Sequence, residues 1–343
     1  MSQQQDPILR LKKSIASTIS DYRHQPDSGI DAIHVDKWIS QFNQNDREFV
    51  LTQTDELLKI FYITEQKYDD FVTAIIKRPA NEEYFLGYSF LDIQASGNSQ
   101  HEILEKMQLA ANEHGRFKLL TINSFTKKEN LRNKFIYQDD LSFSAKKALS
   151  DITAFCEGND IRNADIIIAF FIQFSSGKHY LLTELKKRLE SRNINISISR
   201  MSVMGRGFLL ENRLTYSKQS DVFWPRENLI EIPQWATTPT YVGEYRNGFI
   251  EGDVFKNSEN RDRYEKILTE KGFLILEHSL ERKPSLKPLG FKTYHGLGFG
   301  GSVFSYRNCP NNTPLVFWWG TYEHTGNKAL DCWYPLMKRA GYE

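Results

Sequence analysis

Two adjacent carboxylates, Asp139 and Asp140, follow the apolar strand-like run Phe135–Tyr137 and precede a short loop of small residues and a helical pattern. In an open α/β sheet, ligands bind beyond the carboxyl ends of the strands, which is where such a loop lies. Carboxylates there can hold ribose hydroxyls directly or through a divalent cation, and backbone N–H groups at the helix start can hold a phosphate. The segment predicts a sugar-phosphate site. The alternative is that Asp140 only ends the strand and that Ser142 or Ser144 only caps the helix.

A second polar loop lies one strand–helix step upstream. The loop connects the strand-like run 84–93 to a helical pattern over 99–113. The candidate ligand contacts in and beside it are Asp92, Gln94, Ser96, Gly97, Asn98 and Ser99. The glycine permits a close backbone approach, and the last serine can cap the helix or contact an anion. Two phosphate-competent loops at one sheet edge suit a ligand that carries phosphates at both ends of a sugar.

Strand and helix patterns alternate through the middle of the chain. Strands are predicted over 84–93, 117–122, 135–137, 166–174 and 194–198, and helices over 99–113, 144–155 and 180–190. This alternation is typical of right-handed crossovers in a mostly parallel sheet. The most apolar run, Ile166–Ile172, fits a strand buried on both faces, whereas a membrane span needs about 20 apolar residues.

The two ends of the chain differ from this middle part. Helical patterns begin at Pro7 and cover 46–59 and 64–77, and a clear helix over 260–272 is expected to stop at Gly272. Strand-like runs cover 302–306 and 315–319, and residues 205–255 indicate an irregular insertion or hood. We therefore expect an N-terminal helical region (1–80), an α/β core with a hood (81–255) and a C-terminal mixed α+β elaboration (256–343).

Composition limits the classes of protein. The chain has 343 residues and a net charge of +1, so no global charge excess favours a nucleic acid or a membrane surface as partner. Three cysteines without a Cys-x-x-Cys pair do not predict a disulfide scaffold, and the polar opening residues do not resemble a signal peptide. A cytoplasmic protein with no membrane partner is expected.

Three further motifs are weaker. The glycine-rich run 296–301 fits GxGxxG but precedes a strand pattern, so a glycine loop or bulged hairpin is preferred to a dinucleotide site. Residues 175–178 follow a strand and precede a helix, but lack the features of a Walker motif; only Lys178 is retained as a candidate ligand contact. Cys309, His324 and Cys332 are too widely spaced for a structural zinc site, and buried thiols are expected instead.

The Asp-Asp loop resembles the phosphoribosyl-pyrophosphate loop of type I phosphoribosyltransferases, and loop 94–99 is placed like their pyrophosphate loop. Three stretches together resemble a phosphoribosyltransferase-like family of bacterial conflict and antiphage systems, including some retron operons. They are residues 34–42, residues 91–100, and a tail at 306–314 that continues into 318–319 and 333–336. The resemblance implies an α/β fold with a mostly parallel sheet of the type I phosphoribosyltransferase kind.

What the resemblance implies about function is specific. Phosphoribosyl pyrophosphate or a related nucleotide would be the ligand, and Mg²⁺ the cofactor. Asp139 and Asp140 would be the catalytic and metal-binding residues, and Ser142, Ser144 and Lys146 would contact the phosphate. The protein would act as a toxin-like antiphage effector, with operon partners such as a reverse transcriptase and its DNA–RNA product.

Two alternatives stay open. Phe143 and Ala145 occupy positions where an active phosphate loop usually has glycines, which favours a catalytically silent nucleotide sensor or scaffold. A nucleotide glycosidic hydrolase, in which water replaces the acceptor base, is the other. The acceptor substrate itself is not encoded in any local pattern.

Overall fold

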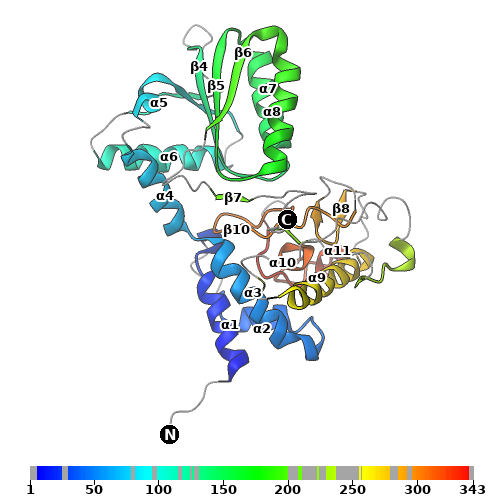
Figure 1. Cartoon of the computed structure of the whole chain (residues 1–343). Helices are drawn as coiled ribbons and strands as arrows, with labels where there is room; N and C mark the ends of the chain where they lie inside the picture. Colours follow the sequence, from blue (N-terminus) through cyan, green and yellow to red (C-terminus); the bar gives the residue numbers. More distant parts are fainter. Residues whose placement is uncertain are drawn as a thin grey trace. The chain divides into compact units, whose positions relative to one another are not determined.

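We describe the fold from a computed structural model of the chain (Figure 1). The residues that the structure describes are 6–24, 30–78, 82–94, 99–114, 118–123, 126, 131–199, 208–210, 222–223, 229–236, 255, 257–278, 285–291 and 296–339. The chain divides into two compact units, one formed by residues 66–213 and one by residues 1–65 together with 214–343. Each unit is described by itself.

The unit of residues 66–213 is built on a parallel sheet. Its strands are β2 (Ser89–Asp92), β3 (Thr121–Asn123), β4 (Lys134–Ser142), β5 (Ala164–Phe174), β6 (Ile194–Ser199) and β7 (Phe208–Leu210). The order is β3-β2-β4-β5-β6, every neighbouring pair is parallel, and β7 pairs in parallel with the end of β5. The predicted α/β class and mostly parallel sheet are confirmed.

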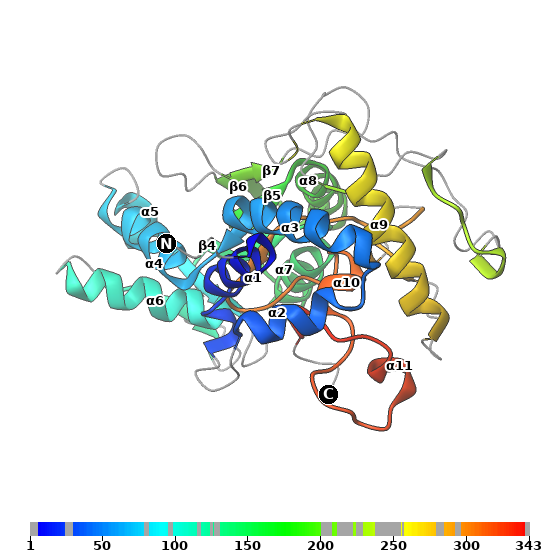
Figure 2. The same ribbon diagram turned by 90° about the horizontal axis from the view of Figure 1, so that it is seen from below.

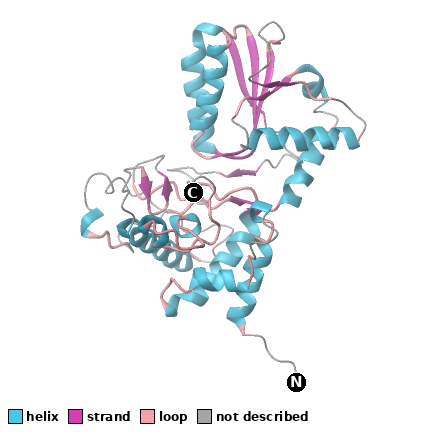
Figure 3. Cartoon of the chain, turned by 180° about the vertical axis from the view of Figure 1, so that it is seen from behind, coloured by secondary structure: helices cyan, strands magenta, loops and turns pink. Residues whose placement is uncertain are grey.

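Helices cover both faces of this sheet (Figure 3). They are α4 (Glu65–Lys77), α5 (Glu82–Gly87), α6 (Ser99–Glu113), α7 (Lys146–Gly158) and α8 (Ser175–Leu189). Leu149 of α7 and Leu185 of α8 belong to one buried cluster with Ile168 of β5. On the opposite face, Phe71 of α4 meets Phe171 of β5 edge-on at 4.0 Å between ring centroids. The unit therefore has three layers, helix–sheet–helix.

Some predicted boundaries in this unit were wrong. Residues 84–87, predicted as the start of a strand, belong to helix α5, because a short apolar run does not distinguish a buried helix turn from a strand. Strand β4 continues through Asp139 and Asp140, so the acidic pair lies within the strand rather than after it. Helix α8 begins at Ser175, five residues before the predicted start, immediately after β5 ends.

The other unit joins the N-terminal helices to the C-terminal part of the chain. Its main elements are α1 (Pro7–Thr18), α2 (Ala32–Ile39), α3 (Arg47–Phe61), β1 (Tyr62–Ile63), α9 (Ser258–His278), β8 (Leu286–Lys287), β9 (Gly290–Phe291), β10 (Phe304–Ser305), α10 (Leu315–Trp318) and α11 (Lys328–Asp331). Helix α1 lies between α2 and α3 (Figure 2), and β1 pairs in parallel with β10.

The stretches 34–42 and 333–336, which are almost 300 residues apart, pack together in this unit. The indole N–H groups of Trp38 and Trp333 both donate to the carbonyl oxygen of Val316, at 2.8 and 2.9 Å. His34 lies in the same core, with Nε2 at 2.8 Å from the carbonyl oxygen of Leu336. These residues are therefore parts of one hydrophobic core.

Two predictions for the C-terminal part were wrong. Helix α9 does not stop at Gly272 but continues to His278; a Cβ atom at Gly272 would lie 2.7 Å from Cα of Pro288, so this glycine allows a close approach. Residues 315–318, predicted as a strand, form the short helix α10. Most of the predicted hood, 205–255, lies outside the described residues, and the three-part domain division stays a prediction.

The glycines of the GxGxxG run (296–301) allow backbone segments to pack closely. A Cβ atom at Gly300, whose φ is +73°, would lie 2.2 Å from the carbonyl oxygen of Phe223, and one at Gly298, with φ +120°, would lie 2.7 Å from the carbonyl oxygen of Gly290. These glycines permit backbone segments to touch.

Among the helices in the described part of the chain, none has the length and apolar character required to cross a bilayer.

Candidate functional site

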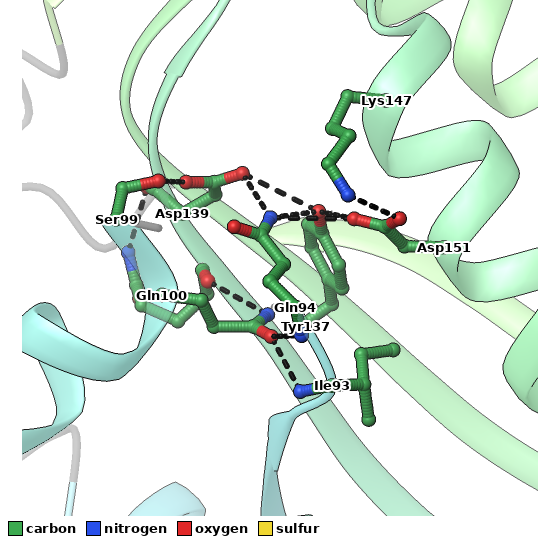
Figure 4. A network of polar contacts seen from close by, with 9 residues as sticks. Ile93, Gln94, Ser99, Gln100, Tyr137, Asp139, Lys147 and Asp151 are labelled. Atoms are coloured by element: carbon green, nitrogen blue, oxygen red, sulfur yellow. Dashed lines mark hydrogen bonds and ion pairs between the residues drawn. The ribbon is translucent and has the colours of Figure 1, made fainter. Parts of the chain in front are cut away.

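The two predicted ligand loops meet at one edge of the sheet, where β2 and β4 end (Figure 4). The hydroxyl of Ser99, the first residue of α6, donates to Oδ1 of Asp139. The side-chain amide of Gln94 donates to Oδ2 of the same carboxylate at 2.8 Å. The carboxyl ends of two neighbouring strands are thus joined through a single aspartate.

The carboxylate of Asp139 is surrounded by donors. Besides Ser99 and Gln94, it accepts from the backbone N–H of Asp140 at 2.9 Å, and the hydroxyl oxygen of Tyr137 lies 3.3 Å from its Oδ2. Burial, together with the nearby charge of Asp140, raises the pKa of Asp139 to about 7. Since a carboxylate offers about four acceptor positions, these contacts occupy most of them. In this arrangement Asp139 holds the two loops together and has little acceptor capacity left for a ligand.

The same network extends to helix α7. The hydroxyl of Tyr137 donates to Oδ2 of Asp151 at 2.9 Å, and the ammonium of Lys147 lies 2.7 Å from Oδ1 of Asp151. The amide nitrogen of Gln94 contacts Tyr137 at 2.9 Å as well as Asp139. Burial and the charge of Asp139 raise the pKa of Tyr137, so its hydroxyl stays protonated and can donate. The same nitrogen lies 3.3 Å from Oδ2 of Asp151, so three side chains hold the Gln94 amide.

The side chain of Gln100, in the first turn of α6, binds the backbone at the end of β2 and of β4. Its side-chain oxygen accepts from the backbone N–H groups of Ile93 and Gln94 at 2.7 and 3.2 Å, and its amide donates to the carbonyl oxygen of Gln138 at 3.1 Å. The side chain has no exposed surface. One buried amide thus satisfies backbone groups at the end of β2 and fixes the start of α6 to β4.

Asp140 differs from its neighbour. Successive side chains on a strand point to opposite faces, so Asp140 lies on the α4–α6 face of β4 while Asp139 lies on the α7 face. Its Oδ1 accepts from the backbone N–H of Leu141 at 2.7 Å, and the residue is only partly buried. Asp140 is the more accessible of the two carboxylates.

The loop after β4 is held by aromatic packing and by α8. Phe143 is buried and stacks on Phe174 at 4.6 Å, and Gly177 lies against the carbonyl oxygen of Phe143. The left-handed position of the loop belongs to Ala145, with φ +58°, and not to Phe143. An alanine therefore occupies the position that favours glycine.

Two helices begin beside this loop. Helix α7 starts at Lys146 after Ala145, and α8 starts at Ser175 after Phe174; neither N-cap side chain can accept a hydrogen bond. The first N–H groups of a helix and its dipole attract anions. Lys178, in the first turn of α8, is partly buried and follows Gly177, so it lies near the same loop.

The remaining predicted residues vary in position. Asp92 ends β2 and accepts from Nδ1 of His101 at 2.8 Å, a hydrogen bond that raises the pKa of His101. Ser142 is buried at the end of β4, Ser144 is partly buried and Lys146 is exposed. The predicted contacts Ser96, Gly97 and Asn98 lie outside the described residues.

The side chains present indicate which residues could bind a metal ion. Within the ranges that the structure describes, no group of three or more His, Cys, Asp or Glu residues could hold a metal ion. Mg²⁺ is commonly bound through one or two carboxylates plus substrate phosphates, so Asp140 fits this role better than the buried Asp139, whose oxygens already accept from Gln94 and Ser99. Burial raises the pKa of Cys309 to about 12, which opposes the thiolate that zinc requires.

A hollow of about 780 Å³ lies at the opposite edge of the sheet. Residues at the amino ends of β5 and β6 line it, among them Asp165 and Asn195, with Lys186 and Lys187 of α8. Because ligands of open parallel sheets bind at the carboxyl edge, we assign the candidate site to the joined loops instead.

Sequence reasoning missed Tyr137, Gln100 and Asp151. Each has a role that depends on contacts across the sheet or with α7. The one local signal is the position of Gln100 in the first turn of a predicted helix that follows a strand. Nothing in the local sequence marks Asp151.

Comparison with known proteins gives one match. No curated protein and no solved structure matches the chain. The model of the PRTase-CE family matches residues 35–339, which includes the sheet, both joined loops and the tail. The chain therefore belongs to the PRTase-CE family, a phosphoribosyltransferase-like family.

Proposed function

We propose that this protein binds phosphoribosyl pyrophosphate, or a related nucleotide, at the carboxyl edge of β2, β4 and β5. The observation that carries the proposal is the direct joining of loop 94–99 to the acidic pair, through Gln94 and Ser99 on Asp139. A ligand with a sugar between two phosphate groups needs two such loops at one edge. The family supports phosphoribosyl or nucleotide ligands.

Different residues would contact different parts of this ligand. Asp140, the accessible carboxylate, would accept hydrogen bonds from ribose hydroxyls, while Asp139 positions the loops. The N–H groups at the start of α7, with Ser144 and Lys146, would hold the 5′-phosphate, and Lys178 would lie near the same anion. Bound Mg²⁺ would supply charge neutralisation for the phosphate oxygens beside Asp140.

A transfer reaction would pass through a sugar with oxocarbenium character. A negative charge fixed close to the ring stabilises such a cation electrostatically. Asp140 supplies that charge from a strand whose position is set by the Asp139 network.

Calorimetry with phosphoribosyl pyrophosphate, with and without Mg²⁺, tests the proposal. We expect Mg²⁺-dependent binding that Asp140→Asn weakens by about tenfold or more, because a charge-assisted contact is lost. Glu157→Gln, an exposed charge change at the far end of α7, is the matched control and leaves binding unchanged. No binding at millimolar ligand would reject the proposed function.

A nucleotide-binding protein without transferase activity is the second candidate. The observation that favours it is the phosphate loop, where Phe143 is packed on Phe174 and Ala145, not glycine, adopts the left-handed conformation. Release of pyrophosphate in the presence of acceptor bases would support the transferase. Ribose 5-phosphate formed without any acceptor would indicate a hydrolase, and binding without turnover would indicate the silent sensor.

The resemblance of residues 34–42 and 306–314 motivates a biological role as an antiphage effector, with operon neighbours that include a reverse transcriptase and its DNA–RNA product. Phage plating with the operon carrying Asp140→Asn would show whether the site is needed. Co-purification of the neighbours at two salt concentrations tests the partners, since six or more phosphate contacts would lose about a thousandfold in affinity at the higher salt.

A further inference from the structure

Arg23 has a backbone conformation that is unusual for an arginine. Its φ is +59° and its ψ +24°, in the left-handed region that disfavours a Cβ atom. Of the other described non-glycine residues with positive φ, three are asparagine or aspartate, which tolerate this region, and the fourth is Ala145. Strain of this kind persists only where the surrounding structure holds the residue, and it is common at ligand sites.

Three segments of the chain meet at Arg23. Its backbone N–H donates to the carbonyl oxygen of Tyr306 at 2.5 Å. The hydroxyl of the neighbouring Tyr22 accepts from the backbone N–H of Cys309 at 3.0 Å and donates to the carbonyl oxygen of Lys338 at 2.9 Å. Tyr22 is buried. Residues 22–23, 306–309 and 337–338 are therefore held together around one buried hydroxyl.

The guanidinium of Arg23 carries a charge that no described acid neutralises. The side chain is partly buried, and within the part of the chain that the structure describes no hydrogen bond or ion pair holds it. Asp21, the nearest carboxylate along the chain, accepts from the hydroxyl of Tyr62 and from the backbone N–H of Glu65, both at 2.7 Å. The strained residue thus presents an unused cation.

The hydroxyl of Tyr322 is a second unused donor in the same neighbourhood. Its oxygen accepts from the backbone N–H of Lys338 at 2.9 Å, and no described atom accepts its proton. Burial raises the pKa of Tyr322, so the hydroxyl keeps that proton. The charge of Arg23 acts on this hydroxyl and on that of Tyr22, which brings the guanidinium close to both.

Arg339 adds a second guanidinium. One of its terminal nitrogens donates to the carbonyl oxygen of Cys309, whose N–H is bonded to Tyr22, so Cys309 joins Arg339 to the buried hydroxyl. The group lies over the ring of Trp318, 5.6 Å from its centroid. Its Nε is buried and has no hydrogen-bond partner among the described residues. Arg339 is thus fixed at one nitrogen and unsatisfied at another.

The unused groups of these three side chains are all donors. An arginine cannot accept a hydrogen bond, and the Tyr322 oxygen is already bonded to Lys338. A planar guanidinium matches two oxygens of a phosphate or carboxylate, and such charge-assisted bonds are strong. A metal cation would be repelled, and a neutral ligand would leave both charges unmatched. The chemistry selects an anion with several acceptor oxygens.

We propose that Arg23, Tyr322 and Arg339 form a site for an oxyanion, the phosphate or carboxylate group of a small ligand. The bond from the Arg23 backbone to Tyr306 fixes the strained residue where its guanidinium can reach that anion. All three residues belong to the unit of residues 1–65 and 214–343, and none of them takes part in the proposed function. Either proposal can hold without the other.

Melting temperatures of the full chain test the site. Sodium phosphate, pyrophosphate and citrate are each compared with sodium chloride at equal ionic strength, so that general screening cancels. We expect an oxyanion to raise the melting temperature progressively with its concentration, as a ligand of the folded state does. A response to phosphate and pyrophosphate alone would identify a phosphate ligand, and a response to citrate alone a carboxylate ligand; either supports the site.

Arg23→Gly separates strain from binding. Glycine adopts the left-handed conformation without strain, so in chloride this variant should melt about 1–3 °C above the unchanged protein. It should also need about tenfold more anion for the same response, because a guanidinium contact is lost. Arg339→Gln should weaken the response in the same way.

Asn193→Gly is the matched control. Asn193 is also left-handed, with φ +52°, but belongs to the unit of residues 66–213, so the anion response should stay as it is. Three results would overturn the site: no oxyanion effect beyond that of chloride, an unchanged response of Arg23→Gly, or a lower melting temperature of Arg23→Gly in chloride. The last would show that the guanidinium stabilises the fold without any ligand.

Discussion

Gly177 lies directly against the backbone of Phe143: a Cβ atom at position 177 would stand 2.1 Å from the Phe143 carbonyl oxygen. The first turn of α8 therefore fixes the loop that follows β4. Only a residue without a side chain permits this contact, because the blocking atom belongs to backbone and cannot rotate away.

We expect Gly177→Ala to lower the free energy of unfolding by about 1–3 kcal/mol, the usual cost of overpacking, and to weaken ligand binding by displacing residues 142–145. Urea unfolding and calorimetry would measure the two effects. Gly158→Ala is the matched control, since nothing lies within 4 Å of its added Cβ. That control should be neutral or slightly stabilising; equal behaviour of the two variants would contradict the contact.

Ala145→Gly should stabilise the protein. Ala145 has φ +58° and ψ +6°, a left-handed conformation that disfavours a Cβ atom, and glycine adopts it without strain. The expected gain is about 0.5–1 kcal/mol after the greater flexibility of glycine in the unfolded chain is subtracted. Ala154→Gly, on the exposed face of α7, should instead cost about 1 kcal/mol. Denaturant titration of both variants checks the opposite signs.

Gln100→Met should destabilise the sheet unit more than any exposed glutamine would. The substitution leaves the N–H groups of Ile93 and Gln94 and the carbonyl of Gln138 without their buried partner, at a cost of about 2–4 kcal/mol. Hydrogen exchange at the end of β2 should also become faster. Gln66→Met on α4, where the side chain is exposed, is the control, with an effect below about 0.5 kcal/mol. Unchanged exchange at β2 would refute the role of Gln100.

His34 should make stability fall in mild acid. Burial lowers the pKa of His34, and its Nδ1 accepts from the hydroxyl of Tyr334 at 2.9 Å while Nε2 donates to Leu336. The folded state thus binds a proton less readily than the unfolded state. The stabilising effect is complete above the ordinary histidine pKa of about 6.5 and is lost as the pH falls towards the lowered value.

Urea midpoints between pH 7.5 and 5 would measure this loss, and His34→Gln should reduce the slope. A slope that His34→Gln does not change would assign the acid sensitivity to other groups.

The sheet was predictable because its signals are local. The buried run of β5 and the alternation of strand and helix around it need only the sequence nearby, and both were found. Residues 84–87 were misassigned because an apolar run fits a buried helix as well as a strand; in the structure Phe85, within α5, stacks on Phe90 of β2 at 5.8 Å between ring centroids.

The site was only partly predictable. The acidic pair and loop 94–99 were recognised by residue type, but the assignment of different roles to Asp139 and Asp140 depends on which face of β4 each occupies. The contact between Tyr137 and Asp151 depends on the packing of α7 on the sheet, and no local pattern in the sequence indicates it. Unpaired atoms such as those of Ser142 and Gln173 are visible only when all neighbours are known.

The pairing of β1 with β10 has a consequence for synthesis on the ribosome. Tyr62 is made early, yet its strand partner Phe304 is more than 200 residues later in the chain, after the entire sheet unit. Because domains fold as units while the chain emerges, residues 66–213 can fold first. The N-terminal helices can pack on one another, but the apolar surface that they bury against the C-terminal residues stays uncovered until those residues have been made.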